Sequence, residues 1–374
     1  MKQFKDYLRL SRRRLPHFLF EYINGGTFDE ITLDDNVARL AQVKLRQRVM
    51  RDMSEITTRT TLLGQPFAMP VVLSPVGLVG MTVRRGEVQA ARAAVRSGIP
   101  YCMSTYSLCP IAEVGERVDA PFWFQLNMFK DRGFIRETLA EVARYCSTLI
   151  FSADLSVLGT RYRDYRTGLF APAGLRGQAM RFLQAAVRPG WAWDVGLRGR
   201  PHGLGNIQRY LDAHGIAEDT HHWTGANIDP STTWREVAWI REQWAGPLVI
   251  KGILDPDDAE EAVAVGADAI VVSNHGGRQL DSASATVDAL PPIARRVAGR
   301  RTVFVDGGIR SGLDVLKMLT LGADGVFLGR AWAAALAAQG EAGVVDFLAT
   351  IQAELVQGLG MTGHRSVAEI ARPF

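Results

Sequence analysis

A histidine and an arginine stand three residues apart in a glycine-bearing segment, "SNHGGRQLD" at residues 273–281. Arginine binds a carboxylate through two parallel hydrogen bonds, and a nearby histidine can take a proton from the adjacent carbon or its hydroxyl. We therefore interpret Arg278 as an anion clamp and His275 as a general base. A lone histidine is more often structural, so this interpretation depends on which other groups the fold brings beside it.

Two further charged residues lie at the ends of short apolar runs. Asp154 ends "TLIFSAD" (148–154), where it is placed to orient the imidazole and stabilise its protonated form. Lys251 lies near the end of "PLVIKG" (247–252). A lysine at this point pairs with a buried carboxylate or supports an anion, and beside a flavin ring its charge would stabilise added electrons. A Schiff base on Lys251 is the competing functional interpretation.

The segment "DGGIRSGLDVLKMLTLGADGVFLGR" (306–330) has the pattern of a phosphate site. It places Asp306, Gly307, Gly308 and Arg310 after one apolar run, and Gly329 and Arg330 after the next. Glycines let backbone N–H groups approach phosphate oxygens, and arginines add charge-assisted hydrogen bonds. These glycines could merely form turns, but the doubled pattern favours a phosphorylated cofactor or substrate.

Eight short apolar runs carry these groups, and each of them ends in polar or glycine residues. Continuous apolar runs are typical of parallel strands that are covered on both faces, and amphipathic stretches separate most of them. Eight such units predict a (β/α)8 TIM barrel, in which the polar residues that end the strands meet at one rim. A Rossmann-type sheet is the alternative, but no GxGxxG follows the first strand. The runs are 71–77, 101–105, 122–128, 148–154, 247–252, 269–277, 302–308 and 325–330.

We expect one domain over residues 1–374, with an N-terminal helical segment over about 1–65 and the barrel over about 66–374. A long insertion, about 155–246, separates the fourth and fifth predicted strands. Its loop at 175–205 interleaves arginines with Phe182, Trp191 and Trp193. That composition suits either a lid packed on the barrel or a monotopic membrane contact, and both can hold.

Composition excludes several other classes of protein. The formal net charge is only +4 over 374 residues, so a nucleic-acid role is not expected. The cysteines, Cys102, Cys109 and Cys146, have no metal-ligand spacing and indicate reduced thiols and no metal site. No signal peptide and no membrane-spanning run is expected, so we predict a cytoplasmic location, with peripheral contact to the inner face of the cell membrane as the extension.

The motifs closely resemble the FMN-dependent L-2-hydroxy-acid oxidase and dehydrogenase family. The likeness covers nearly the whole chain, from "LPHFLFEYINGG" through "SPVGLVGM", "FQLNMFKDRG", "RYRD" and "WAWDVGLRGRPHGLGN" to "VIKGILDPDDA", "SNHGGRQLD" and "DGGIRSGLDV". The N-terminal and tryptophan-rich segments look most like the bacterial quinone-linked L-lactate dehydrogenases. The resemblance implies FMN as cofactor and oxidation of a 2-hydroxy acid to a 2-oxo acid. It does not decide whether the α-hydrogen leaves as a proton or as a hydride.

The resemblance also implies a role for each matching residue. His275 would be the base and Asp154 its partner, Arg278 and Arg161 would bind the substrate carboxylate, Tyr22 would donate a phenol hydrogen bond, and Lys251 would lie by the flavin. The remaining matches would bind FMN. Those expected at the ring are Pro75, Val76, Gly77, Ser104, Gln125, Ser152 and Ser273, and those at the ribityl chain and phosphate are Asp306, Gly307, Gly308, Arg310, Gly329 and Arg330.

Three positions depart from the family pattern. Asn127 stands where a tyrosine would contact the substrate, Ser152 stands where threonine is usual, and Tyr106 occupies a variable pocket position. One hypothesis is a remodelled pocket in which Asn127 opens room and Tyr106 supplies a phenol again, for a larger or non-lactate hydroxy acid. The alternative is tolerated drift with lactate retained as substrate.

Two other classes compete with the redox enzyme, a non-redox flavin or phosphate barrel and a protein that binds FMN only as a structural part. The group formed by His275, Arg278 and Arg161 opposes the first, and retention of Asp154 and Lys251 opposes the second. For the electron acceptor we expect quinone or O2, and the tryptophan-rich loop favours quinone. By analogy with the family we expect a homotetramer.

Overall fold

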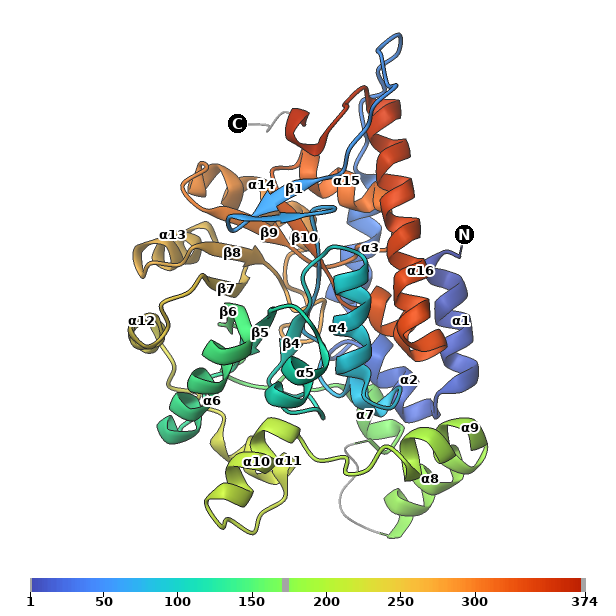
Figure 1. Ribbon diagram of the computed structural model, residues 1–374, viewed down its shortest axis with the longest axis vertical. Helices are drawn as coiled ribbons and strands as arrows, with labels where there is room; N and C mark the ends of the chain where they lie inside the picture. The colour runs from blue at the N-terminus through green and yellow to red at the C-terminus, as the bar shows by residue number, and fades with distance from the viewer. Residues whose placement is uncertain (1, 170–174, 371–374) are drawn as a thin grey trace.

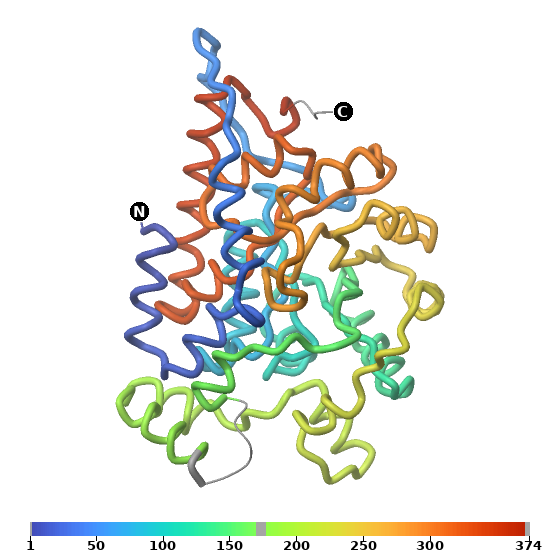
Figure 2. Tube along the Cα trace, turned by 180° about the vertical axis from the view of Figure 1, so that it is seen from behind, coloured from blue at the N-terminus to red at the C-terminus, as the bar shows by residue number. Residues whose placement is uncertain are grey.

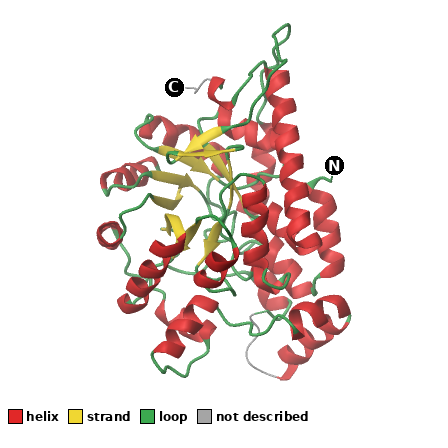
Figure 3. Cartoon of the chain, viewed as in Figure 1, coloured by secondary structure: helices red, strands yellow, loops and turns green. Residues whose placement is uncertain are grey.

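Eight parallel strands curve into a nearly closed barrel, as the sequence predicts. The structure, a computed structural model, describes residues 2–169 and 175–370. The strand order β3-β10-β9-β8-β7-β6-β5-β4 follows the chain around the barrel (Figures 1 and 3). A parallel bridge between Leu73 and Tyr101 links β3 to β4. This order excludes the Rossmann alternative, which requires an open sheet. The strands are β3 (Val71–Leu73), β4 (Cys102–Ser104), β5 (Phe122–Leu126), β6 (Cys146–Ser152), β7 (Leu248–Ile253), β8 (Ala269–Val272), β9 (Thr302–Val305) and β10 (Gly325–Leu328).

Most strands end earlier than the predicted apolar runs. β3 stops at Leu73 and β8 at Val272, so the polar and glycine residues that follow form loops at the carboxyl end of the barrel. Loops at this end carry the active sites of TIM barrels. The shorter strands therefore place the predicted groups on loops instead of in the sheet.

The interior of the barrel is filled by side chains from alternate positions of its strands. Val72, Trp123, Val249, Phe304 and Phe327 form a fully buried inner cluster. A second and larger cluster fills the space between the strands and the surrounding helices. The barrel is thus a packed core with no pore, and only its carboxyl end remains open to a ligand.

An antiparallel hairpin that the sequence did not predict packs against the amino end of the barrel. It consists of β1 (Thr60–Leu62) and β2 (Gln65–Phe67). Leu62 belongs to the inner cluster, and the ring of Phe67 meets Trp123 edge to face at 6.4 Å. The expected helical segment over 1–65 is therefore wrong beyond Gln42, because the described residues 43–59 contain neither helix nor extended strand.

Helices cover the outside of the barrel. N-terminal caps fix several of them, including Asp131 on α6, Asp255 on α13 and a Thr233–Glu236 capping box on α12. The N-terminal helices are α1 (Phe4–Arg14), α2 (His17–Asn24) and α3 (Ile31–Gln42). The barrel helices are α4 (Gly86–Arg96), α5 (Ile111–Arg117), α6 (Arg132–Tyr145), α12 (Trp234–Gln243), α13 (Pro256–Ala264), α14 (Thr286–Val297), α15 (Gly312–Thr320) and α16 (Arg330–Thr362), with short turns η1 (Val79–Met81) and η3 (Val367–Glu369).

One helix in the described part of the chain, α16, is long and apolar enough to cross a membrane by length and composition. It packs against α1, α4 and α15, and 61% of its most apolar window is buried inside the protein. Its helical geometry is interrupted at Gln339 and Gly340. These contacts account for its apolar composition, so α16 is a core helix of the barrel.

The insertion between β6 and β7 contains two helical groups that lie at one end of the molecule (Figures 1 and 2). The first group contains α8 (Leu175–Ala186), α9 (Pro189–Trp191) and the π-helix η2 (Ala192–Leu197), preceded by α7 (Tyr162–Arg166). The second contains α10 (Gly205–Ala213) and α11 (Thr220–Asn227), and α10 packs on α6. Residues 170–174 of the predicted loop lie outside the described residues.

Candidate active site

A cavity of about 470 Å³ lies at the carboxyl end of the barrel and receives nearly every predicted site residue. Asp154 and Ser273 are the two exceptions, and they contact the lining residues His275 and Lys251. Its lining includes Tyr22, Pro75, Val76, Gly77, Ser104, Tyr106, Gln125, Asn127, Ser152, Arg161, Lys251, His275, Arg278, Asp306, Gly307, Gly308, Arg310, Gly329 and Arg330.

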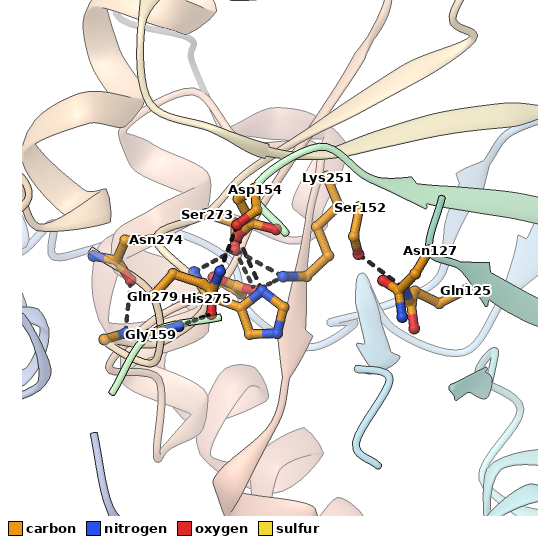
Figure 4. Close-up of polar contacts among 12 residues, drawn as sticks. Gln125, Asn127, Ser152, Asp154, Gly159, Lys251, Ser273, Asn274, His275 and Gln279 are labelled. Carbon is orange, nitrogen blue, oxygen red and sulfur yellow. Dashed lines mark hydrogen bonds and ion pairs between the residues drawn. The ribbon is translucent and has the colours of Figure 1, made fainter. Parts of the chain in front are cut away.

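His275 and Asp154 form a direct pair. His275 Nδ1 lies 2.9 Å from Asp154 Oδ2 (Figure 4), which leaves Nε2 as the ring nitrogen not held by this contact. Burial raises the pKa of Asp154, but His275 and Lys251 outweigh it and the pKa is lowered. Asp154 is therefore ionised near neutral pH, and Nδ1 carries the proton that it donates to the carboxylate.

The backbone holds this pair in an unusual geometry. His275 has a φ of +56°, a left-handed conformation that is uncommon for a residue with a side chain. Its amide N–H donates to Ser273 Oγ at 3.0 Å. At Gly252, which has a φ of +106°, an added Cβ would lie 2.7 Å from Asp154 Cγ, so only glycine leaves room for the carboxylate.

Lys251 pairs with a buried carboxylate, which was one of its two expected roles. Its Nζ lies 3.1 Å from Asp306 Oδ2 and donates to Ser273 Oγ at 2.8 Å. Burial lowers the pKa of Lys251, but Asp306 and Asp154 outweigh it and the pKa is raised. A charged lysine is therefore fixed in the floor of the cavity, and the raised pKa opposes the neutral amine that a Schiff base requires.

Two arginines and a tyrosine form another part of the cavity wall. The Arg278 and Arg161 guanidinium carbons lie 4.9 and 5.5 Å from the centroid of the Tyr22 ring. Arg278 donates to the carbonyls of Tyr22 and Gly25, and Arg161 pairs with Asp164. Burial and the charge of Arg161 lower the pKa of Arg278 to about 10. This wall has an excess of buried positive charge, which suits a bound carboxylate.

A second cationic group lies at the predicted phosphate site. Arg310 and Arg330 line the cavity, and burial lowers the pKa of Arg310 to about 10. Burial, Arg278 and Arg310 lower the pKa of Arg330 further. Arg330 donates to the carbonyls of Gly276 and Gly25, while its Nε is buried without a partner among the described residues. Buried arginines that repel one another fit a site for an anion such as the phosphate of FMN.

The glycine pair at 307–308 has a structural requirement that the sequence did not reveal. Both residues have positive φ, at +89° and +76°. A Cβ on Gly308 would lie 2.2 Å from the carbonyl oxygen of Asn36, and one on Gly307 would lie 2.6 Å from Thr286 Oγ1. The absence of side chains at Gly307 and Gly308 therefore allows α3 to pack against this loop, in addition to allowing any contact with phosphate.

Several residues that sequence reasoning did not select hold the site together. Gln279 Nε2 donates to the carbonyls of Asp154 and Val157, which ties the loop after β6 to the loop after β8 (Figure 4). Asn36 and Asn274 exchange reciprocal amide hydrogen bonds at 2.9 and 2.8 Å. Gln279 and Asn274 lie inside the quoted "SNHGGRQLD" motif, which was the available signal, whereas Asn36 had none. Other cavity-lining residues not selected include Leu155, Leu158, Tyr165, Leu204, His221 and Thr224.

The aromatic residues of the insertion divide between the core and the surface. Trp191 is buried and donates through Nε1 to the Met81 carbonyl at 2.7 Å, as a packed lid requires. Trp193 and Phe182 are instead 61% and 72% exposed. We call the exposed group on α8, η2 and the turn between them the α8–η2 surface; it comprises Phe182, Leu183, Val187, Trp193 and Leu197.

Comparison with known proteins finds a matching family model and similar curated sequences. The model of the FMN-dependent dehydrogenase family matches residues 11–374. An L-lactate dehydrogenase of Pectobacterium atrosepticum is 54% identical over 366 residues, covering 98% of this chain and 94% of that protein. An L-lactate dehydrogenase of a Caulobacter species is 53% identical over 369 residues, covering 98% and 96%.

Two solved structures show the same fold. The monotopic membrane protein (S)-mandelate dehydrogenase superposes with a TM-score of 0.91 at 31% identity, covering 99% of this chain and 98% of that chain. A mandelate oxidase with (S)-4-hydroxymandelic acid gives a TM-score of 0.85 at 33% identity, covering 99% and 97%.

Proposed function

The chain belongs to the FMN-dependent dehydrogenase family and is an FMN-dependent 2-hydroxy-acid oxidoreductase, and we propose that it oxidises L-lactate to pyruvate with the residues assembled around the cavity. The observation that carries the proposal is that the His275–Asp154 pair and the Arg161–Tyr22–Arg278 group meet at one cavity. A proton acceptor and a carboxylate site that face one cavity are what oxidation next to a carboxylate requires.

FMN supplies the acceptor for the two electrons that leave the substrate. The residues suited to its phosphate are Arg310 and Arg330 with the loops at Gly307, Gly308 and Gly329. Those suited to its ring are Lys251, Ser104, Gln125, Ser152 and the backbone of residues 75–77, while Ser273 and Asp306 hold Lys251. Lys251 would offer the fixed positive charge that an electron-rich ring needs.

Arg278 and Arg161 would bind the substrate carboxylate between them. Both guanidinium groups lie near the Tyr22 ring, whose hydroxyl donates to the Gly77 carbonyl at 3.3 Å. A carboxylate bound here would neutralise the charge that lowers the pKa of Arg278. The second carbon of the substrate would then lie towards His275 on the other side of the cavity.

His275 would take one proton from the substrate at Nε2. Its Nδ1–H is held by Asp154, so Nε2 carries the free lone pair. Once the ring is protonated, the ionised Asp154 stabilises its positive charge. The two electrons, together with the other hydrogen that the oxidation removes, would pass to FMN, and the proton held by His275 would pass to solvent.

Product analysis tests the proposed activity. The purified FMN-loaded protein, given L-lactate and an artificial electron acceptor, is expected to form one pyruvate for each two electrons transferred. D-lactate is the matched control and should be inert, because it reverses the positions of the hydrogen and the methyl group. (S)-Mandelate should be tested in the same assay, because one structural neighbour is named (S)-mandelate dehydrogenase. Absence of any 2-oxo acid from all of these acids would refute the proposal.

We further propose that the protein binds the inner face of the cell membrane and passes its electrons to a membrane quinone. The α8–η2 surface presents large apolar side chains beside Arg198 and Arg200, a composition suited to a monotopic interface with anionic lipid. The name of the (S)-mandelate dehydrogenase structure describes that neighbour as a monotopic membrane protein, which supports the same placement.

Replacing Phe182 and Trp193 with serine is expected to lower the affinity for anionic phospholipid vesicles at least about tenfold, because burial of each side chain contributes about 1.5–3 kcal/mol. Co-sedimentation measures the bound fraction. The matched control replaces Val49 and Met50, which are 71% and 99% exposed in the segment at the opposite end of the molecule (Figure 1). Equal binding by both double variants and the wild type would contradict the membrane proposal.

A further inference from the structure

Two buried side-chain polar atoms on neighbouring parts of the cavity wall make no geometric hydrogen bond within the described part of the chain. Tyr106 follows β4 and Asn127 follows β5, and both residues line the cavity. Within the described part of the chain, the Tyr106 hydroxyl and Asn127 Nδ2 are buried and make no hydrogen bond. An unpaired buried polar group is costly, so native proteins give it a partner or keep it for a ligand.

A chain of hydrogen bonds fixes which end of Asn127 faces Tyr106. The Tyr106 backbone N–H donates to Ser104 Oγ at 3.2 Å, and the Ser104 hydroxyl donates to Gln125 Oε1 at 3.3 Å. Gln125 Nε2 then donates to Asn127 Oδ1 at 2.7 Å and to Ser152 Oγ at 3.0 Å (Figure 4). The Asn127 side-chain oxygen is thereby occupied by Gln125, and the amino group is the end of the amide that can interact with Tyr106.

The Asn127 amino group and the Tyr106 hydroxyl influence each other. Burial and Tyr22 raise the pKa of the Tyr106 hydroxyl, while Asn127 and Arg161 lower it. An amide N–H can only donate, so any approach of the Asn127 amino group to the Tyr106 hydroxyl makes the phenol oxygen the acceptor and turns the phenol proton away from Asn127.

The direction left to that proton is the cavity. The Tyr106 backbone is tied to the loop after β3, since the Leu78 N–H donates to the Tyr106 carbonyl at 2.9 Å. A Cβ placed on Gly77 would lie 3.1 Å from Tyr106 Cβ and 3.4 Å from the Tyr22 hydroxyl, so both tyrosines converge on Gly77. Tyr106 therefore stands on the side of the cavity where Tyr22 and Arg161 form the carboxylate wall.

We propose that Tyr106 donates a hydrogen bond to the carboxylate of the bound 2-hydroxy acid, and that Asn127 is a positioning residue that turns the Tyr106 hydroxyl proton into the cavity. The inference rests on the proposed function, since it assigns a further contact in the same site. It makes Tyr106 the third donor to the carboxylate after Arg278 and Arg161. It also gives the amide at position 127 a defined orientation in place of a direct contact with substrate.

Tyr106→Phe is expected to raise both the KM for L-lactate and the dissociation constant of pyruvate about ten- to a hundredfold, the effect of one lost hydrogen bond to a charged group. The turnover number should change less, because the bond is made in the ground state and the transition state alike. Pyruvate binding is followed by the change in flavin absorbance.

Tyr7→Phe is the matched control for the loss of a phenol. The Tyr7 hydroxyl is also buried and without a partner in the residues that the structure describes, but it lies on α1 outside the cavity. It should leave KM and the pyruvate dissociation constant unchanged. If Tyr106→Phe stays within twofold of the wild type, the proposed contact does not exist.

Asn127→Asp tests the positioning role. An aspartate accepts hydrogen bonds from both Gln125 and Tyr106, so it draws the phenol proton away from the cavity. The substitution should therefore raise KM strongly in the wild type and clearly less in the Tyr106→Phe background, where only charge repulsion remains. If the increase in KM of the double variant equals the product of the increases in the two single variants, Asn127 does not position the Tyr106 hydroxyl.

The two proposals fail in different ways. A wild-type protein that oxidises no 2-hydroxy acid refutes the proposed function and this inference together. A wild type that turns over L-lactate, combined with an unaffected Tyr106→Phe variant, refutes only the role of Tyr106 and Asn127.

Discussion

His275→Asn is expected to lower the turnover number about 10²- to 10⁴-fold, the usual contribution of a positioned general base. Asparagine is the replacement of choice because His275 has a φ of +56°, a conformation that asparagine tolerates better than most residues. The amide keeps a polar group in the cavity but cannot take a proton at neutral pH. FMN content and KM should stay close to the wild-type values, because the proposed role of His275 is proton transfer and not the binding of FMN or substrate.

Asp154→Asn provides the companion measurement. The substitution removes the charge that holds the Nδ1 proton of His275, and with it the preference for a basic Nε2. Asp154→Asn should lower the turnover number in the wild type but hardly at all in the His275→Asn background, because the effects of residues that act as a unit are strongly non-additive. If the turnover number of His275→Asn stays within about threefold of the wild-type value, His275 is not the general base.

Arg278→Met is expected to lower kcat/KM about thirtyfold to several thousandfold, since truncating one partner of a buried, hydrogen-bonded charge pair costs about 2–5 kcal/mol. Arg278→Lys keeps the positive charge but loses the planar fork that matches a carboxylate, so it should fall between Arg278→Met and the wild type. Steady-state kinetics with L-lactate measure both.

A structural cause must be separated from lost binding, because Arg278 also donates to the Tyr22 and Gly25 carbonyls. The melting temperatures of the same variants measure the structural contribution. Arg39→Met is the matched control: Arg39 ties α3 to α14 through an exposed ion pair with Asp288 at 2.9 Å, and such pairs contribute at most about 1 kcal/mol. Kinetics for Arg278→Met that match those of Arg39→Met would contradict the carboxylate clamp.

The barrel and most of the cavity could be predicted because they depend on local signals. Each buried run that ends in polar residues marks one strand and one loop, and a TIM barrel brings all eight loops to one rim. His275, Arg278, Lys251 and Asp306 were thus expected near one another without knowledge of any contact. Asp154 is predicted as the partner of His275, and the structure pairs the two side chains. Ser273 is predicted at the flavin ring, whereas it is not among the cavity-lining residues and accepts a hydrogen bond from Lys251.

The contacts that could not be predicted join distant parts of the chain. The N-terminal helices close the site, since the Gly25 carbonyl accepts from both Arg278 and Arg330, and Asn36 packs against the 307–308 glycines. No local pattern marks a backbone carbonyl or a buried asparagine as a partner. The glycine pair was interpreted only through phosphate, while the close approach of α3 sets an equal requirement.

The hairpin at the amino end was missed although a weak signal existed. Leu63 and Gly64 form its two-residue turn with φ of +49° and +77°, the positive values typical of hairpin turns. A leucine at the first turn position is unfavourable for that conformation, so "TLLGQPF" lacks the usual Asn-Gly or Asp-Gly signal. Packing of Leu62 and Phe67 at the end of the barrel determines the hairpin instead.

Anaerobic mixing of the FMN-loaded protein with L-lactate follows electron transfer from the substrate to FMN, with His275 as the base, in the absence of any later electron acceptor. In the wild type the visible absorbance band of the flavin is expected to disappear. In His275→Asn the same loss should occur at least about a hundred times more slowly. Retention of the band by the wild type with L-lactate and with (S)-mandelate, or equal rates in the two proteins, would contradict this mechanism.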